Sequence, residues 1–462
     1  MRSRHCAFAA VLLSVSATSA PTAPPNIYNL GTLGGNTNAF AINNAGQITG
    51  TSAVASWHAF LYTGTPGSGG MMHDLGTLGG TYSIGSEIND SGQIAGSSWT
   101  TDDAAGHAFL YTGTPGSGGM MHDLGTLGGI SSWAYGVNDS GQIVGKSATL
   151  PNFYEHAFLY SGTPGVDGIM HDLGTLGGTN SYGSDINDSG QIAGMSDTAG
   201  GFSRAFLYTG TPGIDGVMRD LGSVHIDDVG SRAFAINDRG QVTGSYDVLV
   251  DEFFNIPRAF FYIGTPGVDG MMHDLGITGY GYEINDRGQV VGSECAFNGT
   301  FCEFGHAFVY TGTPGADGKM IDLDAWLNVN NPVEGAKWTL SRGLGINDNG
   351  LITGDGHYDD GPGGLSDGYR AFLLDASSLL LPDLPGDFNF NGSVDAADYV
   401  VWRKIDGTQT GYDTWRSNFG RTSGSGLAMG GASNLAVPEP GSLGLLAFAV
   451  PALLGRRKYP QI

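Results

Sequence analysis

The chain has 462 residues and a formal net charge of −24, with 20 Lys and Arg against 44 Asp and Glu. Glycine occupies 79 positions and apolar residues make up 40% of the chain, so we expect a packed fold with many tight turns. Phosphate binding needs clustered Lys and Arg, and their scarcity argues against a nucleic-acid partner. Long helical bundles are disfavoured because glycine at this density breaks helices. The composition favours an all-β protein.

The first 20 residues are typical of an export signal. Arg2 and Arg4 precede an apolar run from Ala7 to Val15, and small residues follow it up to Ala20. The run is too short to cross a membrane as a helix. We therefore predict a signal peptide over residues 1–20 and an exported protein at the surface of a Gram-negative-type cell or outside it.

Two cysteines remain once this signal, which contains Cys6, is removed. Cys295 and Cys302 lie seven positions apart, and in an oxidising exterior they can close a small disulfide loop. Two free thiols are the alternative. A metal site is disfavoured because no His or second Cys pair accompanies them at ligand spacing.

A unit with a period of 49 residues at its clearest is repeated seven times. The segment Ile88–Gly96 recurs at 137–145, 186–194, 236–244 and 284–292, with weaker copies at 42–50 and 346–354. A His-Ala-Phe or Arg-Ala-Phe segment starts at His58, His107, His156, Arg204, Arg258, His306 and Arg370. An Asp-Leu-Gly segment follows in most units, at Asp74, Asp123, Asp172, Asp220 and Asp274.

Each unit contains four short strand candidates, which in the second unit are 83–88, 93–97, 107–111 and 120–124. An Asn-Asp-x-Gly turn joins the first two, and Thr-Gly-Thr-Pro-Gly joins the third to the fourth. Four antiparallel strands in each of seven repeats predict an all-β, seven-bladed β-propeller over residues 26–376. An open β-solenoid is the alternative.

The ends of the repeat array favour closure into a ring. Residues 27–31 look like a fourth strand with no unit before them, and the last unit has no clear fourth strand after Leu374. Pairing the first segment with the last unit would complete that unit and hide open sheet edges.

Two of the four connections in each unit vary in length, and in an up-and-down sheet both emerge on the same face. Binding residues tend to lie on variable loops carried by a rigid scaffold. Aromatic rings with carboxylates suit a sugar or peptide ligand, while unconstrained drift of the loops is the alternative. The candidate ligand-binding residues on this face are Trp57, Trp99, Tyr154, Asp251, Phe254, Phe301 and Tyr358.

No residue is predicted to be catalytic. The repeated His, Asp and Asn-Asp positions are interpreted as structural, because a catalytic group is usually needed once. The sequence has no nucleophile elbow, zinc-spaced His pair or phosphate loop. A pair of carboxylates for glycoside hydrolysis, contributed by different units, stays open.

These units resemble the HAF extracellular repeats of bacteria through the His-Ala-Phe at His58, His107, His156 and His306. The resemblance implies export but brings no established activity.

A calcium-loop pattern follows Pro385. Oxygen-bearing side chains fall at loop positions 1, 3, 5, 9 and 12, with Gly392 at position 6 for the sharp turn. The candidate calcium ligands are Asp387, Asn389, Asn391, Ser393, Asp395 and Asp398. Residues 386–420 resemble a dockerin type I repeat, which implies bound calcium, a small helical module and a cohesin-like surface protein as partner. A second ligand loop is missing, so a calcium-stiffened spacer is the alternative.

A Gly/Ser-rich linker, residues 421–436, leads to the tail 437–462. The tail combines Pro438, Glu439 and Pro440 with an apolar stretch from Leu443 to Leu454, expected to be helical, and a basic cluster after it. This order resembles the bacterial PEP-CTERM sorting tail. The resemblance implies transient membrane contact and a sorting protease of the exosortase type, and a simple membrane anchor is the alternative.

Together these features predict an exported cell-surface or extracellular-matrix protein with a non-catalytic role in binding or assembly. Extracellular polysaccharide or a cohesin-like surface protein is the candidate partner. The alternatives are an enzyme acting on extracellular polysaccharide, either a glycosidase or a lyase, and a passive structural spacer.

Overall fold

The computed structural model describes residues 26–152, 154–225, 228–249, 255–297, 302–361, 368–380, 386, 394, 396–405 and 408–421. In this part of the chain antiparallel strands predominate and helices are few and short, so the all-β prediction is confirmed. The predicted signal peptide, linker and sorting tail, including Pro438, Glu439 and Pro440, lie outside the described residues.

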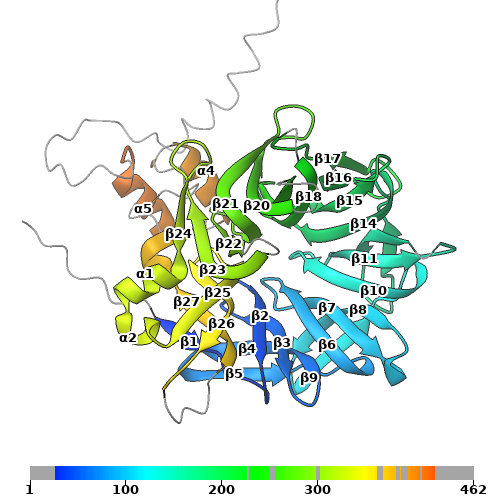
Figure 1. Cartoon of the computed structure of the whole chain (residues 1–462), viewed down its shortest axis with the longest axis horizontal. Helices are drawn as coiled ribbons and strands as arrows, with labels where there is room; N and C mark the ends of the chain where they lie inside the picture. Colours follow the sequence, from blue (N-terminus) through cyan, green and yellow to red (C-terminus); the bar gives the residue numbers. More distant parts are fainter. Residues whose placement is uncertain are drawn as a thin grey trace, which may run out of the picture.

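Within the described residues the strands form six antiparallel sheets, and four of them each hold four consecutive strands (Figure 1). The first two sheets consist of β2 (Thr37–Ile42), β3 (Ile48–Ala53), β4 (Trp57–Thr65) and β5 (Ser68–Asp74), and of β6 (Gly79–Ile88), β7 (Ile94–Thr100), β8 (Gly106–Thr114) and β9 (Ser117–Asp123). The next two consist of β10 (Gly128–Val137), β11 (Ile143–Thr149), β12 (Glu155–Ser161) and β13 (Ile169–Asp172), and of β14 (Gly177–Ile186), β15 (Ile192–Thr198), β16 (Ser203–Thr209) and β17 (Val217–Asp220). In the second unit, all four predicted strands overlap the observed ones.

The fifth and sixth units share one seven-stranded sheet, where two separate sheets were expected. It runs through β18 (Asp228–Ile236), β19 (Val242–Leu249), β20 (Asn255–Ile263), β21 (Met271–Ile284), β22 (Val290–Phe297), β23 (Cys302–Thr311) and β24 (Lys319–Asp322). The cause is β21, which serves as last strand of one unit and first strand of the next. Only ten positions separate Leu275 from Asn285, so no loop intervenes, and Gly279 adopts a φ of 141° where the strand passes between partners.

The last sheet combines the two ends of the repeat array. It contains β25 (Trp338–Ile346), β26 (Leu351–Tyr358), β27 (Gly368–Asp375) and β1 (Ile27–Asn29). β1 pairs antiparallel with β27, with Ile27 opposite Leu374, which confirms the predicted pairing of the first segment with the last unit. The first strands β2, β6, β10, β14, β18, β21 and β25 each contact the next, and β25 contacts β2. The sheets therefore follow one another round a common centre (Figure 1).

The core lies between neighbouring sheets and is built from the repeated Ala-Phe-Leu-Tyr strand. Phe158, for example, is fully buried and packs in one cluster with Leu110 of the preceding unit and Ala134 of its own. Both faces of this strand are covered, which explains why it is apolar throughout. Burying such a phenylalanine contributes about 2 kcal/mol, and the contribution recurs in each unit.

Short helices connect or follow the sheets. α1 (Leu323–Asn330) and α2 (Pro332–Gly335) fill the longest connection between units, and α3 (Ser377–Leu380) follows β27. α4 (Ala396–Ile405) and α5 (Gln409–Asn418) contact each other through Tyr399 and Trp415. None of the helices in the described part of the chain has the length and apolar character that a membrane span requires.

A closed cycle of hydrogen bonds joins the hairpins that follow the first strands. The side chain of each hairpin asparagine donates from Nδ2 to the backbone oxygen of the asparagine in the next unit, over 2.9–3.1 Å. The cycle runs through Asn43, Asn89, Asn138, Asn187, Asn237, Asn285 and Asn347 and returns from Asn347 to Asn43. The repeated Asn is thus a link between units as well as a turn residue.

Replacing Asn187 by alanine is expected to lower the free energy of unfolding by about 2 kcal/mol, because buried partners lose their hydrogen bonds. Asn187 Nδ2 donates to the backbone oxygen of Asn237 at 3.0 Å, and its Oδ1 accepts from the backbone N–H of Gln191 at 2.9 Å. Urea unfolding would measure the loss. Ser189→Ala, at an exposed position of the same turn, is the control and should leave the midpoint unchanged.

Candidate binding site at the centre of the ring

The predicted loop residues do not converge on one site. Among the described ones, Trp57 is half-buried in β4, Trp99 is 40% exposed at the end of β7, and Tyr154 is 42% exposed before β12. Tyr358 packs against Trp338, with ring centroids 4.7 Å apart, and so belongs to the core of its sheet. Asp251, Phe254 and Phe301 lie outside the described residues. Of the described four, Trp99 is the one that lines a cavity discussed below.

A cleft of about 190 Å³ lies between the second and third sheets. Its lining, here called the aromatic cleft, consists of Tyr82, Ile84, Ser86, Ser97, Ser98, Trp99, Gly106, Trp133 and Tyr135. Gly106 lies beside the Trp133 ring, since a Cβ added to it would lie 3.8 Å from that ring. Ser97 is 5% exposed, and its hydroxyl has no hydrogen-bond partner among the described residues. An unpaired buried hydroxyl costs about 1–3 kcal/mol, part of which a ligand hydroxyl would recover.

A larger cavity of about 380 Å³, here called the axial chamber, lies at the centre of the ring. It is lined by Phe40, Ser86, Glu87, Tyr135, Lys146, Tyr182, Ser184, Asp185, Phe234, Tyr282, Glu283 and Leu344. Ser86 and Tyr135 line both cavities, so the aromatic cleft and the chamber lie side by side. Seven of the lining residues occupy one repeated position, three residues before the hairpin asparagine, and therefore face the same centre from different units.

Three acidic side chains reach the chamber from the next position along the chain. Glu87, Asp185 and Glu283 belong to the second, fourth and sixth units, while the other units carry Ala or Gly there. Glu87 and Glu283 each accept one backbone N–H bond at 2.9 Å. Asp185 accepts two, at 2.7 Å from Ile186 and 2.8 Å from Ile236.

Burial dominates the acidity of these three groups. It raises the pKa of Glu87 to about 8, with a smaller contribution from the charge of Asp185. The pKa of Asp185 rises to about 6, because its two backbone N–H bonds offset part of the effect. The pKa of Glu283 lies well above its ordinary value, through burial and then repulsion by Asp185 and Glu87. The perturbing groups are carboxyls and backbone amides, with no cation among them.

Lys146 shows how a cation is held beside this chamber. Its Nζ lies 4.7 Å from the ring centroid of Trp133 and 4.7 Å from that of Tyr182. The same Nζ lies 3.0 Å from Glu155 Oε2. Aromatic faces together with one carboxylate thus already bind an ammonium group here.

A second ring of carboxylates surrounds the mouth of the centre, next to the hairpin asparagines. Asp90, Asp139, Asp188, Asp238, Asp286 and Asp348 each accept a bond from the backbone N–H of the preceding unit's turn, over 2.8–3.0 Å. Burial is the largest cause that raises the pKa of Asp238 to about 6. No three His, Cys, Asp or Glu side chains within the described ranges are grouped so that they could hold a metal ion.

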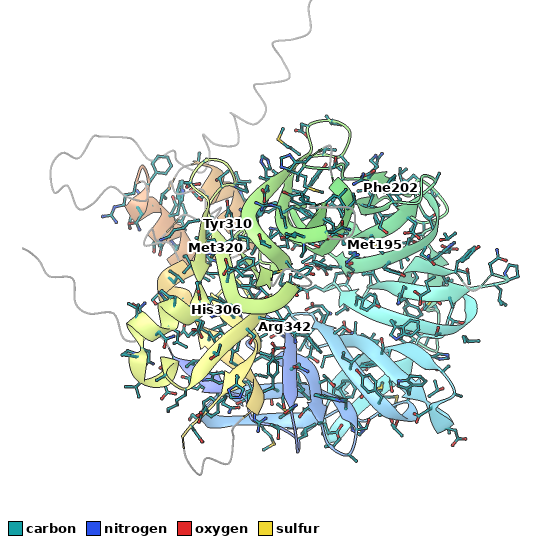
Figure 2. The ribbon with its side chains drawn as sticks, viewed as in Figure 1. Met195, Phe202, His306, Tyr310, Met320 and Arg342 are labelled. Carbon is teal, nitrogen blue, oxygen red and sulfur yellow. The ribbon has the colours of Figure 1, made fainter. Side chains whose placement is uncertain are left out.

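The repeated histidines form pairs inside single sheets. His58 lies 3.0 Å from Asp74, His107 2.9 Å from Asp123, His156 2.9 Å from Asp172, and His306 2.8 Å from Asp322. Arg258 takes the same place opposite Asp274 at 2.7 Å. Each pair joins the third strand to the fourth, which fits the structural interpretation. In Figure 2, His306 lies farther from the centre of the ring than Arg342, whose guanidinium pairs with the buried Asp355.

The predicted calcium and cysteine sites are described only in part. Asp398 is fully buried at the start of α4, whereas Asp387, Asn389, Asn391, Ser393 and Asp395 lie outside the described residues. Cys295 is disulfide-bonded. The side chain of Cys302 lies outside the described residues, so the pairing of these two cysteines stays a prediction.

Comparisons with known proteins do not assign this site. A scan against protein-family models gives no match for the chain. A search of curated proteins also gives none.

Proposed function

We propose that the chain is an exported seven-bladed β-propeller that binds an extracellular glycan without transforming it. The closed asparagine cycle, the cyclic contacts of the first strands and the pairing of β1 with β27 support this architecture. In this view β21 contributes its first half to the fifth blade and its second half to the sixth. Export, surface sorting and the calcium module rest on the sequence patterns alone.

The observation that carries the binding function is the aromatic cleft, which adjoins the axial chamber through Ser86 and Tyr135. Sugar rings present C–H faces that pack on aromatic rings, and hydroxyl groups that need hydrogen-bond partners. Trp99 and Trp133 offer the faces, and Ser97 offers a buried hydroxyl without a partner in the described part of the chain. A sugar chain entering from the cleft would thus meet both requirements.

Trp99→Ala and Trp133→Ala are each expected to weaken glycan binding about tenfold, or about 1.4 kcal/mol, because a stacking face is lost. A screen of purified extracellular polysaccharides and oligosaccharides with the full-length protein would identify a ligand, and calorimetry would measure the affinities. Trp57→Ala is the matched control, since Trp57 lies on the first sheet outside the cleft. Equal loss in all three variants, or no binding on a folded sample, would contradict the proposal.

A polysaccharide hydrolase is the second candidate, and the different pKa values of Glu87 and Asp185 favour it. Two carboxyls in one chamber, one protonated and one ionised near neutral pH, are what acid–base cleavage of a glycosidic bond uses. If the parent protein cleaves a polysaccharide and Glu87→Gln does not, the protein is a hydrolase and the non-catalytic binding function is wrong. Saturable binding without product would support the binding function.

A further inference from the structure

Resting on the proposed glycan-binding function, we propose that the axial chamber recognises an ammonium group, so that the ligand is a glycan containing free amino sugars. The ammonium would lie among Glu87, Asp185 and Glu283, with the sugar chain leading back through the aromatic cleft. A neutral glycan could bind in the cleft, but it carries no positive charge that would pair with three acidic groups in the chamber.

The three acidic groups line one chamber although they are far apart in the sequence. They come from alternate units, and the residues between them are Ala41, Gly136, Ala235 and Gly345. Gly136 is required there, because an added Cβ would lie 2.9 Å from the Asp185 Cα and 3.0 Å from its Oδ1. The small residues therefore keep the carboxyls accessible from the centre.

Glu87 and Glu283 each have a carboxyl oxygen that can accept further hydrogen bonds. One oxygen of Glu87 and one of Glu283 accept a backbone N–H, and the other oxygen of each accepts no bond from the described residues. An ammonium group carries three donors, which can pair with free carboxyl oxygens on the chamber wall. Burial also raises the pKa of Glu87 and Glu283, and a cation bound beside them would favour their ionised forms.

Aromatic rings on one side of the chamber already hold a cation, the ammonium group of Lys146. The Nζ of Lys146 already lies over Trp133 and Tyr182, so ring faces at this wall do accept an ammonium. Tyr135, Phe234 and Tyr282 line the same chamber and supply further rings. A bare divalent metal fits less well, because no described group of carboxyls has the grouping a metal ion requires.

The test compares two oligosaccharides with the same backbone, a glucosamine hexamer and an N-acetylglucosamine hexamer. Calorimetry with the full-length protein near neutral pH should show about tenfold tighter binding of the glucosamine hexamer. In the triple variant Glu87→Gln, Asp185→Asn, Glu283→Gln, the preference should disappear. Each replacement keeps the size of the side chain and removes a half-buried carboxyl, and thermal unfolding would confirm that the variant is folded.

The control is a variant that replaces the same number of carboxyls in the outer carboxylate ring, Asp90→Asn, Asp139→Asn, Asp188→Asn, which should keep the preference. If this control loses the preference as much as the chamber variant does, attraction to the net negative protein explains it and the inference fails. If both hexamers bind equally and Trp99→Ala weakens both, glycan binding stands and the inference fails. If neither hexamer nor any screened glycan binds, the proposed function fails as well.

Discussion

Replacing Gly194 by alanine is expected to destabilise the protein by about 3 kcal/mol or more, because the new methyl group has no room. A Cβ at Gly194 would lie 2.0 Å from the backbone oxygen of Tyr182 and 2.8 Å from the ring of Phe206. Tyr182 belongs to the neighbouring strand and cannot retreat without breaking the ladder that pairs it with Met195. The strands would have to separate, so we expect a lower urea midpoint with an unchanged dependence on denaturant.

The control for this substitution is Gly106→Ala, which also adds a methyl group within a strand. The nearest atoms to a Cβ at Gly106 belong to the Trp133 ring at 3.8 Å, an ordinary contact. Its midpoint should stay close to that of the parent protein. Equal midpoints for Gly194→Ala and Gly106→Ala would show that the close approach between the strands relaxes at little cost.

Much of the fold follows from local patterns that the repeats carry. The Asn-Asp-x-Gly turn places each glycine at positive φ, as at Gly92 with a φ of 77°, and this determines where the first two strands pair. The apolar Ala-Phe-Leu-Tyr strand predicts burial on both faces. The unmatched segment at the start predicts its partner in β27, and the structure contains that pairing.

The fusion of two sheets through β21 was not predicted, although its cause is visible in the sequence. The short spacing between Leu275 and Asn285 was interpreted as ordinary variation in loop length. Whether a short connection becomes a tighter loop or a continuous strand depends on the distance between the strands it joins. That distance is a property of packing and is not encoded locally.

The candidate site was largely missed for a related reason. Variation in loop length predicted Trp99 as a binding residue but not Trp133, Glu87 or Asp185. These three lie inside strands whose sequence resembles that of the scaffold. A signal was present, because Glu87, Asp185 and Glu283 are spaced 98 residues apart, two units each time. Comparing the units position by position would have found acidic residues in alternate units. Only the ring arrangement brings them to one chamber.

The scaffold and the site thus use the repeat in opposite ways. Positions that link the units, such as the hairpin asparagines, keep the same residue in every unit because each performs the same contact. Positions that line the two cavities differ between units, as Lys146 of the chamber and Ser97 of the cleft do at equivalent places on β11 and β7. Variation inside strands, rather than in loops, therefore marks the candidate site in this chain.

The protein is expected to lose stability as the pH rises from about 5 to about 8, the reverse of ordinary acid denaturation. In the unfolded chain Glu87 releases its proton near its ordinary pKa of 4.5, whereas the folded protein holds it up to about 8. Between these values the folded state binds more protons, so each rise in pH favours unfolding. The full shift corresponds to a loss on the order of 5 kcal/mol, reduced where Glu87 and Asp185 titrate together.

Glu87→Gln tests this, because the amide keeps the size of the side chain and does not titrate. Thermal unfolding between about pH 5 and pH 8 should show a melting temperature that falls steadily for the parent protein and less for the variant. At the alkaline end the variant should be the more stable of the two.

His306 changes stability in the same direction, since hydrogen bonding to Asp322 raises its pKa, but it does so equally in both proteins. Asp102→Asn, at an exposed position with a φ of 60° that asparagine tolerates, is the matched control. Parallel curves for Glu87→Gln and the parent would mean that the folded protein does not hold the Glu87 proton.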